Sequence, residues 1–159
     1  MRLHILPFAP CLAVLLTCCG GEPKAAVSSE PAKTAVAKPA DETRRFPITD
    51  RVDTQVIDDH LLDKAFMPGG TLARYKKGKK EYSMFVAKLR AAQDAAFLLL
   101  DWNKALTGSK VEPGFGGYFG QDGTRPVFVF SKGAWIAGVA GLPEKEADLA
   151  ARTLAAHLD

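Results

Sequence analysis

The residues with the most distinctive chemistry are three cysteines, Cys11, Cys18 and Cys19, which all lie near the start of a 159-residue chain. A thiol can form a disulfide, ligate zinc or accept a covalent lipid. The rest of the chain contains no cysteine, which excludes a disulfide framework and a cysteine-based zinc site in the body of the protein. Any chemistry of these thiols therefore belongs to the first 19 residues.

The segment around these thiols has the composition of a secretory signal peptide. It carries Arg2, then an uncharged apolar run that ends at Leu16, and then small and thiol residues. A positive start followed by a short apolar run is the pattern of an export signal. The run is about a dozen residues long, shorter than the roughly 20 that cross a bilayer. The sequence therefore predicts export of the protein and no transmembrane helix.

Leu16-Thr17-Cys18-Cys19 resembles the signal of bacterial lipoproteins, in which Leu, a small residue and Gly or Ala precede the lipidated cysteine. We predict lipidation at Cys19, with Cys18 as the alternative and an ordinary cleaved signal peptide as the other interpretation. The resemblance implies palmitate-type chains that anchor the protein in a bacterial cell envelope, since two acyl chains give stable anchoring. Gly20, where Asp would mark inner-membrane retention in such proteins, favours the outer membrane.

The chain divides into three parts: a signal peptide over residues 1–18, a tether over 19–45 and a domain over 46–159. The tether is rich in Ala, Pro, Ser, Lys and Glu and has no aromatic residue before Phe46. Such a segment buries too little apolar surface to offset the entropy of ordering it, so we predict a disordered linker. The net charge of the whole chain is only +3, which argues against a nucleic-acid partner.

Apolar periodicity predicts the elements of the domain. We expect a short helix over 52–66 that ends at Met67-Pro68-Gly69-Gly70, a hairpin of 71–77 with 81–89, and a long helix over 91–106. An irregular strand over 117–121, a hairpin of 126–130 with 134–140, and a last helix that starts near Pro143 follow. The inward face of the last helix would use Ala147, Ala150, Leu154 and Leu158.

The order of hairpin and helix occurs twice along the domain. We interpret it as a ββα pseudo-repeat that forms one antiparallel sheet with both helices on one face. The predicted fold class is therefore α+β.

A basic cluster lies at the tip of the first predicted hairpin and consists of Lys76, Lys77, Lys79 and Lys80. Such a cluster can dock on anionic lipid or polysaccharide. The alternative is a solvated turn that keeps the hairpin from pairing with other chains. An acidic cluster of Asp58, Asp59 and Asp63 lacks the spacing of a calcium loop and is expected to be a solvated face.

Four aromatic residues, Trp102, Tyr118, Phe119 and Trp135, are candidates for the lining of a pocket between sheet and helices. His60 and His157 have no metal-ligand or nucleophile neighbour at motif spacing, and the glycines at 114, 116, 117 and 120 precede a strand and not the helix that a phosphate cradle requires. We therefore predict no catalytic residue, no metal and no cofactor, and expect these glycines to serve turns and close packing.

The domain also resembles a family of bacterial secreted proteins and lipoproteins that has no assigned activity. The segments that carry the resemblance are Tyr82-Ser83-Met84-Phe85-Val86-Ala87, Gln93-Asp94-Ala95-Ala96-Phe97 and Phe128-Val129-Phe130-Ser131-Lys132-Gly133-Ala134-Trp135. The function expected from the sequence is a membrane-anchored envelope lipoprotein with a non-catalytic domain that binds an envelope protein or polysaccharide. The alternative is a small-molecule carrier or enzyme that uses the pocket above.

Overall fold

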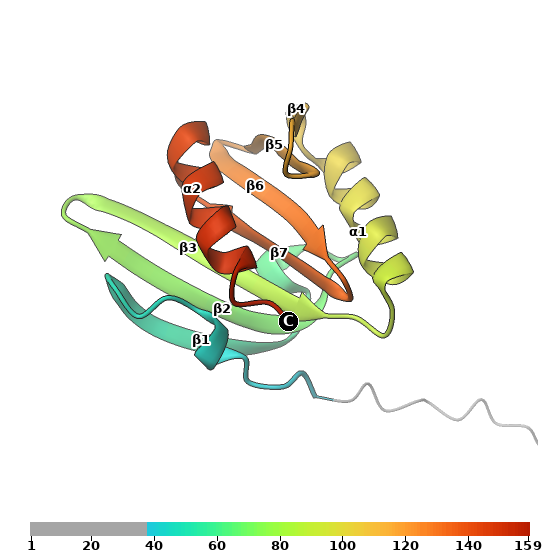
Figure 1. Cartoon of the computed structure of the whole chain (residues 1–159), viewed down its shortest axis with the longest axis horizontal. Helices are drawn as coiled ribbons and strands as arrows, with labels where there is room; N and C mark the ends of the chain where they lie inside the picture. The colour runs from blue at the N-terminus through green and yellow to red at the C-terminus, as the bar shows by residue number, and fades with distance from the viewer. Residues whose placement is uncertain (1–37) are drawn as a thin grey trace, which may run out of the picture. The chain divides into compact units, whose positions relative to one another are not determined.

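The computed structural model describes residues 38–159, so the predicted signal peptide, both candidate lipidation sites and most of the predicted tether lie outside the described residues. The described chain has the predicted α+β class, with one antiparallel sheet in the order β1-β2-β3-β7-β6-β5-β4 (Figure 1). The strands are β1 (Arg51–Asp59), β2 (Pro68–Lys77), β3 (Lys80–Lys88), β4 (Thr107–Glu112), β5 (Gly117–Asp122), β6 (Arg125–Lys132) and β7 (Trp135–Ala140). The helices are α1 (Ala92–Ala105) and α2 (Glu144–Ala155), and two short 3-10 turns are η1 (Thr43–Arg45) and η2 (Leu61–Asp63).

Both predicted hairpins and both later helices are confirmed. In the first hairpin Lys77 pairs with Lys80 across a two-residue turn, and in the second Lys132 pairs with Trp135. Two-residue turns suit the twist of antiparallel strands when their residues can adopt positive φ, as Gly78 does here at 61°. The predicted irregular strand is also present as β5.

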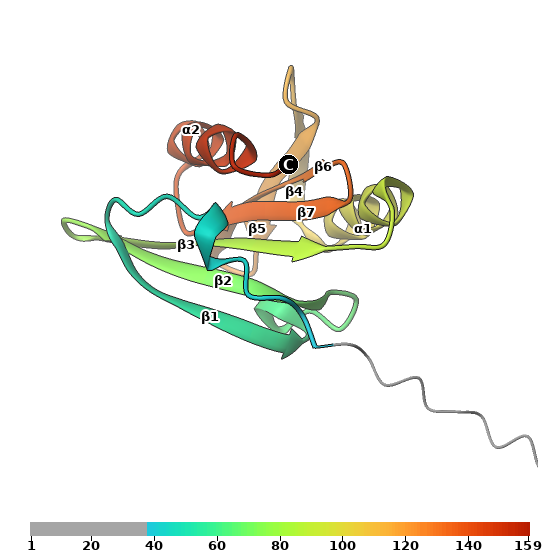
Figure 2. The ribbon, with the colours of Figure 1, turned by 60° about the horizontal axis from the view of Figure 1, so that its bottom comes forward.

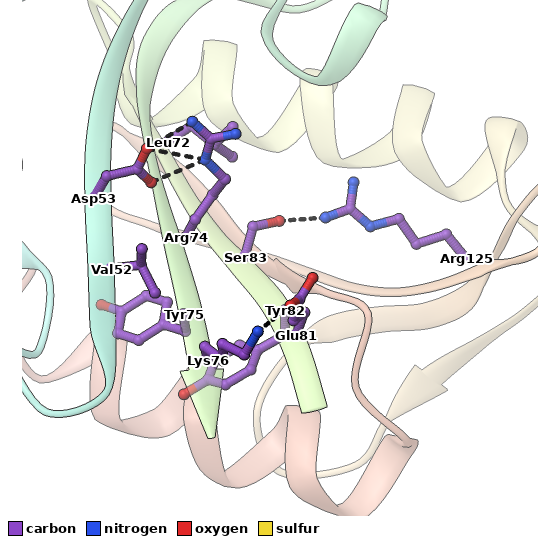
Figure 3. Close-up of a pocket in the computed structure, with 10 residues that line it drawn as sticks. All are labelled: Val52, Asp53, Leu72, Arg74, Tyr75, Lys76, Glu81, Tyr82, Ser83 and Arg125. Atoms are coloured by element: carbon purple, nitrogen blue, oxygen red, sulfur yellow. Dashed lines mark hydrogen bonds and ion pairs between the residues drawn. The ribbon is translucent and has the colours of Figure 1, made fainter. Parts of the chain in front are cut away.

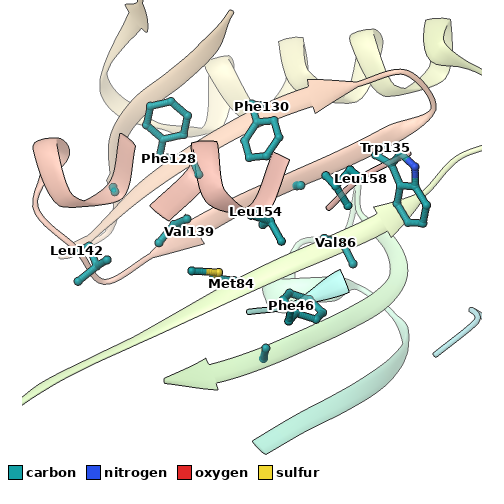
Figure 4. Packing of buried hydrophobic residues seen from close by; sticks show 14 of the residues in the cluster. Phe46, Met84, Val86, Phe128, Phe130, Trp135, Val139, Leu142, Leu154 and Leu158 are labelled. Carbon is teal, nitrogen blue, oxygen red and sulfur yellow. The ribbon is translucent and has the colours of Figure 1, made fainter. Parts of the chain in front are cut away.

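The two helices cover opposite faces of the sheet, so the expectation that both lie on one face is wrong. Phe128 of β6 belongs to the apolar cluster under α2, whereas its neighbour Val129 belongs to the cluster under α1. Successive side chains of a strand point to opposite faces, so these clusters lie on either side of the sheet. Figure 4 shows the cluster under α2.

The placement of α1 and α2 on opposite faces also shows that the predicted ββα pseudo-repeat is not symmetric. β3 and β7 are antiparallel neighbours, and a twofold axis between them would bring both helices to the same face. The order of hairpin and helix therefore recurs without that symmetry. The physical reason is that β3, β6 and β7 contain continuous buried apolar runs. Each face of these strands needs its own cover.

The segment predicted as the first helix is an edge strand followed by a tight turn. β1 pairs with β2 along its length, with Gln55 opposite Leu72. Its β-branched residues, such as Thr54 and Val56, favour extended backbone, and the apolar positions that suggested a helix fit a strand equally well. The chain then reverses through His60, Leu62 and Asp63, which all adopt positive φ.

The Pro-Gly-Gly segment does not end an element but begins β2. A Cβ on Gly69 would lie 2.1 Å from the carbonyl oxygen of Asp58, and one on Gly70 would lie 2.3 Å from that of Val86. These glycines therefore permit close approach of neighbouring strands. β4 was not predicted, because its sequence is polar and it pairs only with β5 at the far edge.

The folded domain begins before Phe46, so the predicted boundary of the tether at residue 45 is wrong. The backbone N–H of Glu42 donates to the hydroxyl of Thr71 at 3.0 Å, and Glu42 and Phe46 are buried. Figure 2 shows this segment passing over β2. It covers the α2 face of the sheet where the helix itself does not reach.

Candidate binding groove

A groove lies on the α1 face of the sheet, where α1 leaves the first three strands open. α1 packs on β4 to β7, and the groove runs over β1, β2 and β3 to the start of β6 (Figure 3). Its volume is about 510 Å³, within the range of small-ligand sites. The lining residues are Val52, Asp53, Leu72, Arg74, Tyr75, Lys76, Glu81, Tyr82, Ser83 and Arg125.

The floor of the groove is a row of polar side chains on neighbouring strands. Asp53 of β1 lies opposite Arg74 of β2, which in turn lies opposite Ser83 of β3. Arg74 donates to both carboxylate oxygens of Asp53, at 2.8 Å from Nε and 2.6 Å from Nη2. These hydrogen bonds lower the pKa of Asp53 and raise that of Arg74. The pair therefore stays ionised across the neutral range, and Nη1 of Arg74 donates to no side chain among residues 38–159.

The next row toward the hairpin tip holds a second ion pair. Lys76 donates to Glu81 at 2.8 Å across the β2–β3 pair. The contact raises the pKa of Lys76 and lowers the pKa of Glu81. Two of the three cations of the groove are thus matched by acids.

Arg125 is the third cation, and no carboxylate among residues 38–159 forms an ion pair with it. Asp122, which lies opposite Arg125 in the adjacent strand, forms an ion pair with Lys64 at 2.5 Å. Arg125 instead donates a hydrogen bond to the hydroxyl of Ser83. Burial lowers the pKa of Arg125 and Asp122 opposes that shift, but a guanidinium remains charged at neutral pH.

Arg125 reaches Ser83 because the intervening strand carries small side chains. Ser83 lies opposite Ala140 of β7, and Ala140 lies opposite Val127 of β6. Arg125, two residues before Val127, points to the same face. A methyl group at position 140 leaves room for the long side chain to cross β7.

Two tyrosines of β2 and β3 lie behind one end of the groove, on the α2 face of the sheet. Tyr75 and Tyr82 stack with ring centroids 4.9 Å apart and planes at 10°. The hydroxyl of Tyr75 donates to the carbonyl oxygen of Pro47 at 2.8 Å. Burial raises the pKa of both tyrosines, so they are neutral at physiological pH and contribute to the cluster under α2.

The structure disperses the predicted basic cluster. Lys76 lies in the groove, and Lys80 forms an ion pair with Glu146 of α2 at 2.6 Å. Lys77 and Lys79 are exposed, and Lys77 borders a smaller hollow of about 230 Å³ between the hairpin and α2. The four lysines therefore do not present one basic surface.

The four aromatic candidates are not brought together either. Trp102 and Tyr118 pack in the cluster under α1, whereas Phe119 and Trp135 pack in the cluster under α2. Trp102 has no exposed surface, and its Nε1 contacts the sulfur of Met67 at 3.1 Å. These residues fill the two cores and line no common pocket.

The other residues considered for chemistry have structural surroundings. His60 lies beside Asp59 at 3.4 Å, and the ring of His157 contacts the carbonyl oxygen of Thr153. Within residues 38–159 no group of His, Cys, Asp and Glu side chains is arranged to hold a metal. No helix in the same range is long and apolar enough to span a membrane.

The glycines between residues 114 and 120 serve turns and close packing, as predicted. Gly114 and Gly116 adopt φ of 79° and 78° in the turn before β5. A Cβ on Gly117 would lie 2.5 Å from the carbonyl oxygen of Val129, and one on Gly120 would lie 2.9 Å from Cβ of Leu106.

Sequence reasoning found only Lys76 among the charged groups of the groove. It placed Asp53 on a helix, where Asp53 has no partner on a neighbouring strand. The contact of Arg125 with Ser83 spans 42 positions and depends on the order of strands in the sheet. Arg74 and Lys76 alternate with Ala73 and Tyr75 in β2, which was a signal that one face of this strand is open to water.

Comparison of the chain with known protein families, with curated proteins and with solved structures finds no match.

Proposed function

We propose that this protein is a lipid-anchored component of the outer membrane of a bacterial cell envelope. Its domain binds another envelope component without catalysis. The lipoprotein signal at Leu16-Thr17-Cys18-Cys19 supports the anchor. The resemblance of the domain to secreted proteins and lipoproteins supports the same location. In this proposal the predicted tether joins the anchor to the domain.

The observation that carries the binding role is the open groove over β1 to β3. α1 covers this face of the sheet only over β4 to β7, so the face stays open over β1 to β3. The groove is lined by charged groups held in fixed rows and by the apolar side chains of Val52 and Leu72. Fixed polar groups beside apolar surface are what orients a bound partner. The proposed partner is an envelope protein or a polysaccharide.

The anchor is tested by metabolic labelling with a palmitate analogue in intact bacteria. The wild-type chain and Cys11→Ser are expected to carry the label, and Cys19→Ser is expected to lose it. Loss in Cys18→Ser with label retained in Cys19→Ser would move the anchor by one residue. An unlabelled wild-type chain would overturn the lipid anchor.

Binding through the groove is tested by site-specific photo-crosslinking in intact cells. Val52 lines the groove and is 66% exposed, while Val111 of β4 at the opposite edge of the sheet is 60% exposed. A crosslinking residue at position 52 is expected to give a discrete adduct that position 111 does not give. Equal adducts at both positions, or none at position 52, would contradict the proposed binding surface.

A further inference from the structure

The groove contains a set of hydrogen-bond donors that the protein itself leaves unused. Ser83 is 3% exposed, and its hydroxyl accepts a hydrogen bond from Arg125. The proton of that hydroxyl has no acceptor among residues 38–159. A buried hydroxyl normally donates as well as accepts, so this proton is available to a ligand.

The guanidinium groups on either side of Ser83 add further donors. Arg125 uses one nitrogen for Ser83, and Arg74 uses Nε and Nη2 for Asp53. Ser83 lies beside Arg74 in register across the β2–β3 pair. Figure 3 shows Ser83 between the two arginine side chains. Donors from three residues therefore converge on one part of the groove.

The charge of the groove is also unbalanced. Arg74 is matched by Asp53 and Lys76 is matched by Glu81. Arg125 adds a positive charge for which the described residues supply no carboxylate partner. A charged group in a partly buried position is stabilised by an opposite charge. An anion bound at this position would provide it.

We propose that the groove binds the oxyanion of a ligand, a carboxylate or a phosphate, with Arg125 and the hydroxyl of Ser83 as the groups that hold it. This inference rests on the proposed function, because it gives the chemistry by which the groove recognises its partner. A guanidinium offers two parallel N–H donors that match two oxygens of either group. Leu72 supplies apolar surface for the part of the ligand next to the anion.

The test is a titration of the full-length, isotopically labelled protein, followed by NMR. Sodium phosphate and sodium acetate are the two probes, each at constant ionic strength against sodium chloride. We expect saturable shifts of the Arg125 Nε–Hε signal and of the Ser83 amide signal. The probe with the higher affinity distinguishes a phosphate from a carboxylate as the preferred group.

Variants of matched charge make the test specific. Arg125→Gln is expected to weaken binding of the preferred probe by about tenfold or more, the loss of a charge-assisted hydrogen bond. Arg125→Lys keeps the charge but removes the paired N–H donors of the guanidinium. Its affinity for the preferred probe is expected to lie between those of Arg125→Gln and the wild type. Arg90→Gln removes an equal charge at an exposed position outside the groove and is expected to bind as the wild type. The amide spectrum of each variant reports whether it folds.

Non-saturating shifts, or equal binding by Arg125→Gln and Arg90→Gln, would overturn the oxyanion site. If the titration fails while the adduct at position 52 forms, the groove binds its partner by other chemistry and only this inference is lost. If the titration succeeds and no adduct forms, the oxyanion site stands and the proposed envelope partner is lost.

Discussion

The guanidinium of Arg45 lies 4.5 Å from the centroid of the indole ring of Trp135. The same side chain donates to Glu42 at 2.9 Å and to the carbonyl oxygen of His157 at 2.8 Å. The contact with His157 joins positions 112 residues apart. Arg45 therefore links the start of the domain to β7 and to the residues after α2.

Removal of this side chain is expected to destabilise the domain. Arg45→Ala would leave the buried carboxylate of Glu42 without its close partner and remove a cation–π contact, at a cost of about 2–3 kcal/mol. Arg44→Ala is the control, because Arg44 is exposed and lies 3.9 Å from the same carboxylate; its expected cost is below about 0.5 kcal/mol. Urea unfolding measures both, and equal effects would contradict the role of Arg45.

Trp102 is expected to behave as a core residue. Its ring contacts Phe66 edge-on at 5.4 Å between centroids and has no exposed surface. Trp102→Ala should lower the free energy of unfolding by about 3–5 kcal/mol. Phe97→Ala, on the exposed side of the same helix at 57% exposure, should cost less than about 1 kcal/mol. A Trp102→Ala variant with wild-type stability would restore the ligand-binding interpretation of this residue.

The start of β2 should tolerate no side chain at position 69. Gly69→Ala would place a Cβ 2.1 Å from a backbone oxygen of β1, and the strands must separate at a cost of about 3 kcal/mol. Gly123→Ala is the comparison, since that Cβ meets nothing within 4 Å but φ is 62°; its expected cost is about 1 kcal/mol. Thermal unfolding ranks the two variants. The reverse order would contradict the close pairing of β1 with β2 at Gly69.

Tyr75 is expected to make stability fall at alkaline pH. Burial raises its pKa in the folded state, so above the ordinary tyrosine value of about 10 the unfolded state loses this proton first. The contribution to stability is complete below that pH and declines as the pH rises. Tyr75→Phe should cost about 1 kcal/mol near neutral pH, from the lost hydrogen bond to Pro47, but show a shallower alkaline decline.

Urea unfolding of the wild type and Tyr75→Phe between about pH 8 and pH 11 measures this difference, with the lower value chosen below the ordinary tyrosine pKa. The lysines titrate in both proteins and cancel in the comparison. If the free energy of unfolding declines equally with pH in both proteins, Tyr75 does not contribute to the loss of stability at alkaline pH.

Local sequence pattern was enough to predict the elements that are regular and strongly apolar. The stripe of Ala95, Leu99 and Trp102 determined α1, and the Lys-Gly segments at residues 77–78 and 132–133 determined the two hairpin turns. These features depend on neighbours within about one or two turns of chain, which is the range that periodicity reports. The lipid anchor at Cys19 is likewise a prediction of local sequence alone, and it stays a prediction.

Only the tertiary structure decided the identity of β1, the opposite placement of the helices and the groove. The 52–59 segment fits a helix or a strand in isolation, and pairing with β2 selects the strand. Arg125 meets Ser83 because β7 lies between β6 and β3 and carries the small Ala140 at that position. Strand order and side-chain size on an intervening strand are set by packing of the whole domain, and no stretch of neighbouring residues encodes them.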